Sequence, residues 1–473
     1  MLSPIIRRAA RTAARAAGRN NDTRCRDKER GVTIALVAVA MVSIIGMAAL
    51  SIDIGTLYEA KAEAQRGADA AALAAARLIS ISGITGDPNN SAGGWQLTCG
   101  TTGTATVAAT SVAQAQWNFV GGRQPSTVKV TYGPGLGSND CSTLAGATSS
   151  FTVNPTVTVY VQQATLPTFF GRIFGLITGA TSSNSGVSAT ATAEVYNPSG
   201  SGSLASGMIP VQPRCVKPWI IPNIDPGAAP NPFVNTTGAI ARTGISPAGV
   251  IGESFLMNAA CKAGKPNCVP GNMNDNPPTY TTVLEYVPAW VQTASSAVPS
   301  CNAEANWTAT NYQQAIAGCD QTTVYACGTP LGSNVDLQEN PVSPAATGDT
   351  GTGVACLTNA PAGADTLAPL TYPFQITAGA GNPLSAQGVS GLITSSNSIV
   401  TIPIYDSSSL APLSPPQQPV TILGFLQVFI NSVDPVTGNM NVTVMNVAGC
   451  SNAATAQPVN GTSPVPVRLI TPP

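Results

Sequence analysis

The stretch RGVTIALVAVAMVSIIGMAALSIDIGTLYEAKAEAQRGADAAALAAARLI, residues 30 to 79, decides how the rest of the chain is placed. Its first part, Gly31 to Ile52, has 22 consecutive residues without a charged side chain. A helix of that length rises about 33 Å, which matches a hydrocarbon core of about 30 Å. Six cations between residues 15 and 30 precede this run, and Asp53 follows it. The positive-inside rule therefore predicts a single-pass anchor with a cytoplasmic N-terminal tail and with all later residues exported.

Two other interpretations of the apolar run are open. A cleavable signal peptide would have an apolar region of about 7 to 15 residues and then a small-x-small site, which Gly46 and Ala48 fit loosely. A buried core helix would seldom follow six cations while carrying no charge of its own. We favour a retained anchor because the apolar run is too long for a signal peptide and the helical pattern continues beyond it.

Strong helix formers dominate from Leu57 to Ile79, with one glycine and no proline. The membrane helix is therefore predicted to continue outward as one rod. Small side chains along one face would let another backbone approach closely, either a neighbouring helix or the protein's own β-rich domain, and we favour the second. The stripe comprises Leu57, Ala64, Ala68, Ala71, Ala75 and Leu78, and the opposite, charged face carries Glu59, Glu63, Arg66 and Arg77.

Composition and charge exclude several classes of function. Charged residues make up 9% of the chain, and nine of the 21 Lys and Arg lie in residues 1 to 30. The exported part is thus net acidic and lacks the basic face of a nucleic-acid-binding protein. The chain has no histidine, which removes Ser-His-Asp and Cys-His relays and most zinc sites, and the Walker A, GxGxxG, GxSxG and HExxH motifs are missing. We predict no enzyme, no catalytic, cofactor or metal site, and no nucleic-acid or small-molecule substrate partner.

Beyond residue 80 the pattern changes to short alternating strands separated by turn residues, which predicts half-buried β-strands. The expected fold class is α+β: a long transmembrane helix extended outward, then mainly antiparallel β modules with short helices. The composition of residues 197–207, NPSGSGSLASG, is that of a flexible linker. The predicted regions are a basic cytoplasmic tail (1–30), the helix (31–80), a first exported β-rich domain (81–196), the linker (197–207) and a second, disulfide-containing β-rich domain (208–473).

Particular elements can be placed within these domains. The sequence DPVTGN, residues 434–439, predicts a hairpin turn because proline presets φ and Gly438 allows positive φ. The expected strands are Thr127 to Tyr132, Thr156 to Gln162, Gly186 to Tyr196, Ile399 to Tyr405, Val420 to Ile430 and Asn441 to Val447, and the expected short helices lie at Leu166 to Gly175 and near Tyr312 to Gly318.

Ten of the eleven cysteines follow the apolar run, an even number that an oxidising compartment would pair into up to five disulfides. If the two domains fold independently, Cys99 has only Cys141 as a partner. Spacing leaves other pairings and free thiols open in the second domain. The short-loop candidates there are Cys261 with Cys268 and Cys319 with Cys327.

The order of features in the opening stretch resembles the N-terminal segment of TadG-like proteins of the Flp pilus (tight adherence) assembly machinery. The matching features are the Arg30-Gly31 start, the apolar span, Asp53-x-Gly55, Leu57-Tyr58 and the block at residues 68–74. Residues 166–175 and 424–433 resemble later segments of the family. The fifth residue after Gly31 is Leu36, whereas prepilin processing requires Glu there, so we expect a retained subunit.

The resemblance implies a bitopic protein of the bacterial cytoplasmic (inner) membrane that is a structural or accessory part of pilus assembly. Its implied partners are the membrane and pilus-assembly proteins or pseudopilins. A membrane-anchored adhesin or binding module unrelated to pili has the same anchor and the same polar β-surface, and is the alternative.

Overall fold

A computed structural model gives the fold. The residues that it describes are 4–82, 98–116, 125–133, 155–164, 166, 186–195, 211–235, 240–242, 245–259, 283–289, 291, 301, 306–319, 325, 344–368, 374–383, 385, 393, 395–406, 421–450, 459–461, 465 and 467–470. The predicted linker, residues 197–207, lies outside them, as does the helix expected after Leu166.

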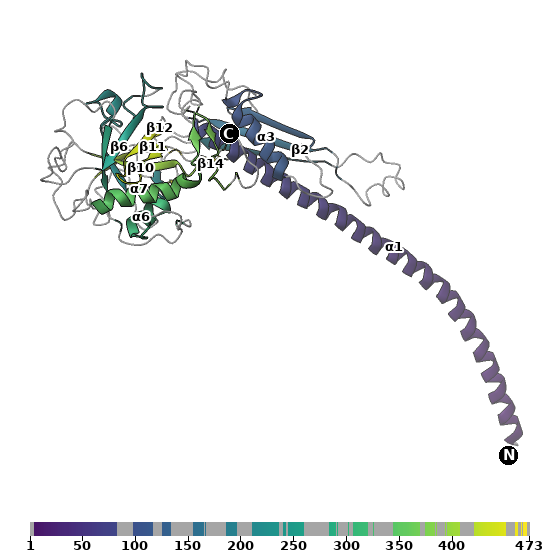
Figure 1. The fold of residues 1–473 in the computed structure, drawn as a ribbon. Coiled ribbons are helices and arrows are strands. Elements are labelled where there is room, and N and C mark those ends of the chain that lie inside the picture. Colours follow the sequence, from purple (N-terminus) through teal and green to yellow (C-terminus); the bar gives the residue numbers. More distant parts are fainter. Residues whose placement is uncertain are drawn as a thin grey trace.

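A single helix, α1 (Pro4–Ile81), carries the chain from its N-terminus into the folded part. It enters the folded part beside α3 and β2, and its N-terminal end projects far away (Figure 1). The helix passes from the apolar run into the alanine-rich stretch without a break, which confirms the predicted rod. The expected α+β class is also confirmed, because sheets with mostly antiparallel pairing and a few short helices follow α1.

A four-stranded antiparallel sheet, here called the helix-backed sheet, packs against the second half of α1. Its order is β1-β2-β3-β14, and α3 (Thr104–Gln116) packs against both α1 and β1. The three strands predicted before residue 197 are confirmed to within one residue at each end. The strands are β1 (Thr127–Tyr132), β2 (Thr156–Gln163), β3 (Val187–Val195) and β14 (Val467–Ile470).

Six strands close into a barrel in the order β10-β11-β12-β6-β7-β5. Its hairpins are antiparallel, but β5 with β10 and β6 with β7 pair in parallel. The predicted turn is confirmed between β11 and β12, where Gly438 has φ 70° and its N–H donates to the Asp434 carbonyl. The strands are β5 (Trp219–Pro222), β6 (Ser254–Ala259), β7 (Val283–Pro288), β10 (Ile399–Tyr405), β11 (Ile422–Val433) and β12 (Met440–Gly449).

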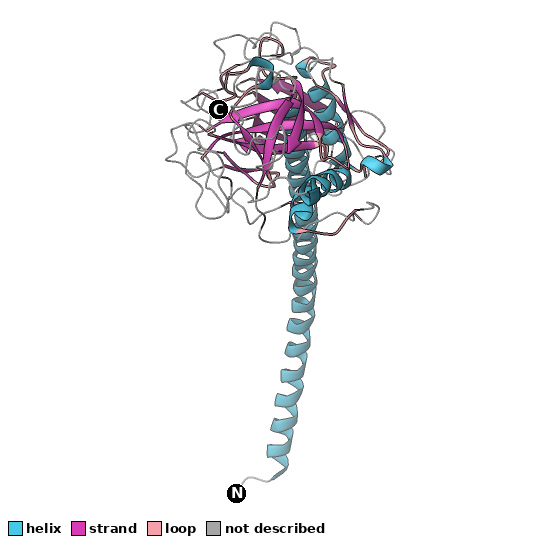
Figure 2. Cartoon of the chain, turned by 60° about the vertical axis from the view of Figure 1, so that its left-hand side comes forward, coloured by secondary structure: helices cyan, strands magenta, loops and turns pink. Residues whose placement is uncertain are grey.

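Short elements cover the barrel, and Figure 2 shows strands and small helices gathered at one end of α1. The predicted helix is present as α6 (Asn311–Ala317), which Thr310 caps with its hydroxyl. The sequence did not predict α7 (Pro344–Thr358), whose later turns are buried against α6 and β11. The remaining elements are β4 (Val211–Pro213), β8 (Thr366–Leu367), β9 (Ile376–Thr377), β13 (Val459–Gly461), η3 (Pro226–Ala228) and η4 (Ala360–Ala362).

The chain returns to the helix-backed sheet at its C-terminus. Strand β14 falls in the predicted second domain, yet it pairs with β3 and completes the sheet of the first. Buried hydrogen bonds also hold the end of α1. Asn446 Nδ2 on β12 of the barrel donates to the Ser80 carbonyl at 2.6 Å, and Ser80 Oγ donates at 3.0 Å to the carbonyl of Val465, which lies in the core of the helix-backed sheet. Segments that are distant in sequence therefore hold the end of α1 against the barrel.

Candidate functional site

The first described part of α1 exposes apolar side chains on all sides. Between residues 32 and 52 the large side chains are 51% to 71% exposed, from Ile52 to Ile34. Ser43 and Ser51 donate their hydroxyls to the carbonyls four residues earlier, at 2.8 and 2.9 Å, so these polar groups are satisfied within the helix. Among the described residues, this helix alone is long and apolar enough to cross a membrane by length and composition.

The environment of α1 changes at Asp53. Its side chain is buried. Farther along, Lys61 Nζ donates to the Ser188 carbonyl, and Gln65 Nε2 donates to the Thr190 carbonyl at 3.3 Å. Tyr58 lies between these contacts and the apolar run and is 73% exposed, a position typical of aromatic residues at a membrane surface. Polar contacts with β3 thus begin within three turns of the end of the apolar run.

The alanine stripe packs against the protein's own domain. Four of its members, Ala64, Ala68, Ala71 and Ala75, are fully buried, while Leu57 and Leu78 are half-buried. The four alanines share one core with alanines of α3 and with valines and alanines of β2 and β3, and Leu78 packs against it. Small side chains on both helices let the backbones lie close together, and the strand valines fill the remaining space. The residues of α3, β2 and β3 in this core include Ala105, Ala109, Ala113, Val157, Val159, Val161, Ala189, Ala191 and Ala193.

The apolar run and the stripe together coincide with one family segment. Residues 31–78 match the family described as "Putative Flp pilus-assembly TadE/G-like". No curated protein and no solved structure matches the chain. The TadE/G-like segment covers about a tenth of the chain and runs from the start of the apolar residues to the last turn of α1. This match supports a role related to Flp pilus assembly, including contact with pilus components and with a membrane.

The charged face opposite the stripe is only partly exposed. Glu59 and Arg66 are exposed and Glu63 is partly buried. Arg77 is also partly buried, near the end of the TadE/G-like segment, where it lines a cavity beside the barrel. Burial lowers the pKa of Arg77. The sequence could not show this, because helical periodicity indicates which side chains share a face but not what covers that face.

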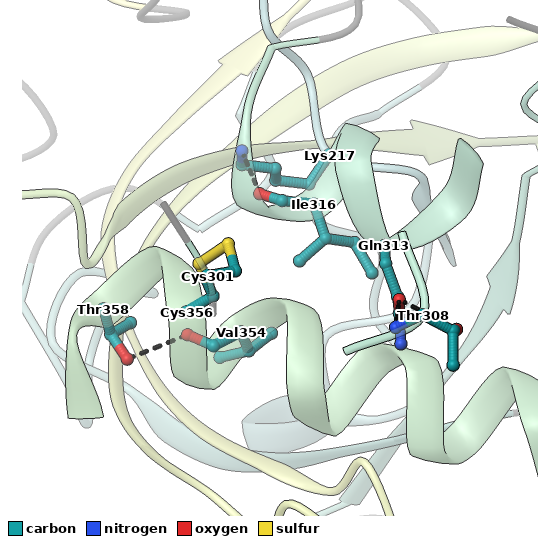
Figure 3. Close-up of a disulfide and its surroundings, with 8 residues drawn as sticks. All are labelled: Lys217, Cys301, Thr308, Gln313, Ile316, Val354, Cys356 and Thr358. Carbon is teal, nitrogen blue, oxygen red and sulfur yellow. Dashed lines mark hydrogen bonds between the residues drawn. A yellow bond between two sulfur atoms is a disulfide. The ribbon is translucent and has the colours of Figure 1, made fainter. Parts of the chain in front are cut away.

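Disulfides fasten the segments that surround the barrel. Cys215 pairs with Cys319. Cys301 pairs with Cys356, which lies in the last turn of α7 (Figure 3). The predicted pairing of Cys319 with Cys327 is therefore wrong, because the fold brings Cys215 to the end of α6 across 104 residues. Cys99 and Cys450 are also disulfide-bonded. The expected partner of Cys99, Cys141, lies outside the described residues, as do Cys261, Cys268 and Cys327.

Three ion pairs, formed by two partly buried arginines, were not predicted. Arg468 on β14 contacts Glu194 on β3 at 2.9 Å, and Arg242 contacts Asp225 at 2.5 Å and Glu253 at 3.0 Å. Burial, and then the nearby Asp225 carboxylate, raise the pKa of Glu253 to about 7, although Arg242 opposes this. Within the described ranges no group of His, Cys, Asp or Glu could hold a metal ion. The pair between Arg468 and Glu194 joins strands that are 274 residues apart, whereas Arg242 binds carboxylates 17 and 11 residues away. All three pairs stabilise the fold.

Proposed function

We propose that the protein is a bitopic, non-catalytic structural subunit of Tad/Flp pilus assembly in the bacterial cytoplasmic membrane. In this proposal the N-terminal tail lies in the cytoplasm, and the helix-backed sheet and the barrel lie outside it. The observation that carries the proposal is the change along one unbroken helix, from apolar residues exposed on all sides to a buried alanine stripe. The match of residues 31–78 supports the assignment to pilus assembly, and the absence of histidine supports a role without catalysis.

The continuity of α1 suggests what such a subunit does. A helix without a break transmits position and orientation, so the sheet would be held at a fixed angle to the membrane. The first fully buried alanine of α1, Ala60, lies eight residues after Ile52, which corresponds to about 12 Å along the helix. The exported body would therefore be held close to the outer membrane–water interface, where it can contact other membrane-anchored pilus components.

The anchor can be tested by placing charges in the apolar run. Ile44→Arg combined with Ile45→Arg should cost about 6 kcal/mol of insertion free energy, at about 3 kcal/mol for each arginine near the centre of a span. The full chain should then shift from the membrane fraction to the soluble or degraded fraction. The matched control is Val436→Arg, at a site that is 75% exposed in the β11–β12 turn and should leave the chain in the membrane.

The topology and the pilus role need separate measurements. Protease added to spheroplasts should cleave the exported body and leave the N-terminal tail protected, and full protection of the C-terminal half would contradict the proposed orientation. Deletion of the gene should reduce the number of surface pili, and expression of the full chain should restore it. Normal pili combined with lost adhesion would instead favour a membrane-anchored adhesin unrelated to pili.

A further inference from the structure

A cavity of about 550 Å³ lies where the last turns of α1 meet the barrel. That volume is within the range of sites for small organic ligands. Two cations from different bodies line it, Arg77 from α1 and Lys217 from the segment before β5. Its apolar wall includes Leu357, Ile399 and Val400, and no Asp or Glu is among its described lining residues. The cavity is therefore positively charged on one side and apolar on another.

Lys217 is held rigidly in this wall. Its ammonium donates to the Ile316 carbonyl at 2.5 Å (Figure 3). It also donates to the Gly318 carbonyl at 2.7 Å. Its backbone N–H donates to the Thr401 carbonyl at 2.9 Å. An ammonium has three donors, so these two bonds leave one for another acceptor. Burial lowers the pKa of Lys217 to about 7, because the charged ammonium is removed from water. A nearby anion would offset this loss of solvation and favour the charged form.

Arg77 differs from the other partly buried arginines of the folded body. Arg242 and Arg468 each contact a carboxylate, at 3.0 Å or less. No described residue forms an ion pair or a hydrogen bond with the Arg77 side chain. A carboxylate does lie behind the wall, that of Asp365, but it accepts bonds from Ser396 Oγ at 2.5 Å and from the Gly379 N–H at 2.8 Å. The fold thus places a guanidinium in the cavity, and the described part of the chain gives it no negative partner.

A purely structural role explains only part of this arrangement. Lys217 caps the C-terminal carbonyls of α6, where a cation is favourable on any helix. Capping does not explain Arg77, which comes from another element and caps nothing in α6. A partly desolvated guanidinium without a partner costs free energy, and a bound anion would offset that cost.

We propose that this cavity binds the carboxylate of a ligand with an apolar body, either a small organic acid or the C-terminus of a peptide. Arg77 presents a planar fork that matches a carboxylate, and the third donor of Lys217 supplies a second contact. The apolar part of the ligand packs against Leu357, Ile399 and Val400. Because the two cations come from α1 and from the segment that leads into β5 of the barrel, the ligand stabilises the junction between the helix and the barrel. The proposal does not depend on a role in pilus assembly. It departs from the prediction, made from the sequence, that the protein has no small-molecule substrate partner.

The test is calorimetric titration of the full chain in detergent at pH 6, where carboxylates are ionised and Lys217 is protonated. The probes are N-acetyl-leucine and a pentapeptide ending in leucine, each compared with its C-terminal amide, and inorganic phosphate is titrated as a third probe. We expect a Kd of about 1 mM or lower for at least one acid and binding at least about 10-fold weaker for its amide. Binding of the peptide alone identifies a chain end as the ligand, and binding of N-acetyl-leucine identifies a small acid.

Substitutions then locate the binding. Arg77→Gln should weaken it about 10- to 100-fold, because one charge-assisted contact is lost. Arg77→Lys keeps the charge but loses the fork, and should weaken it less. The matched control, Arg66→Gln, changes an exposed arginine of the same helix and should have no effect. Equal binding of acid and amide, no binding of either acid, tighter binding of inorganic phosphate than of both acids, or unchanged binding in both Arg77 variants would overturn the proposal.

Discussion

Removal of the arginine that binds a buried carboxylate in the helix-backed sheet should release the C-terminal strand. Arg468 on β14 lies opposite Glu194 on β3 in the strand register. Its Nε donates to Glu194 Oε2 at 3.0 Å, and its Nη2 lies 2.9 Å from the same oxygen. The Glu194 side chain is 0% exposed, while that of Arg468 is 22% exposed. Arg468→Met would therefore leave a carboxylate without its cation in the interior of the sheet.

The expected cost follows from this burial. Removal of one partner of a fully buried ion pair costs about 3 to 5 kcal/mol. Partial exposure of Arg468 admits some screening by water, so we expect about 2 to 4 kcal/mol here. The loss falls on the pairing of β14 with β3, and opening of that edge should become about 30- to 1,000-fold more frequent. The double variant Arg468→Met with Glu194→Met should recover most of the loss, since two apolar side chains can replace a buried pair.

Hydrogen exchange measured by mass spectrometry on the full chain is the assay. Peptides that cover β14 and β3 should exchange faster in Arg468→Met and nearly normally in the double variant. Arg66→Met, at an exposed site of α1, is the matched control and should exchange as the unmodified chain does. The reasoning is refuted if Arg468→Met exchanges no faster than the unmodified chain, or if the double variant loses as much protection as the single one.

Three further predictions concern the barrel and its junction with α1. Peptide mapping without reduction should recover Cys215 linked to Cys319, whereas a peptide that links Cys319 to Cys327 would contradict the fold. Replacement of both Cys215 and Cys319 by serine should lower the free energy of unfolding by up to about 4.7 kcal/mol, because the disulfide closes a loop of 104 residues. Folded Glu253 keeps its proton up to a pKa of about 7, so it binds more protons than the unfolded chain between about pH 4.5 and 7, and its contribution to stability falls as pH rises through that window. Thermal unfolding of Glu253→Gln should lack this part of the decline, and an identical pH profile would count against the buried carboxylate. Asn446→Leu removes the donor to the Ser80 carbonyl and should cost about 1 to 3 kcal/mol, which limited proteolysis near the end of α1 would detect as faster cleavage.

The candidate site was partly predictable because helical information is local. An uncharged run of 22 residues and an alanine-rich continuation specify one long helix whatever surrounds them. Periodicity also found the stripe, four of whose alanines are buried. Periodicity could not place Arg77 in a cavity, because a charged residue opposite an apolar stripe is normally solvated. Here Arg77 lies beside residues of the barrel.

The sequence by itself determined the elements with a short repeat: the rod, the alternating strands and the turn at Gly438, where positive φ favours glycine. Only the tertiary structure decided which strands meet. The parallel pairing of β5 with β10, the return of β14 to β3 and the disulfide between Cys215 and Cys319 join segments that are many residues apart. Helix α7 was missed because its glycines and threonines have low helix propensity, and burial against α6 and β11 stabilises it instead. Long-range pairing leaves no periodic pattern in the chain, because it depends on how separate apolar faces are buried together.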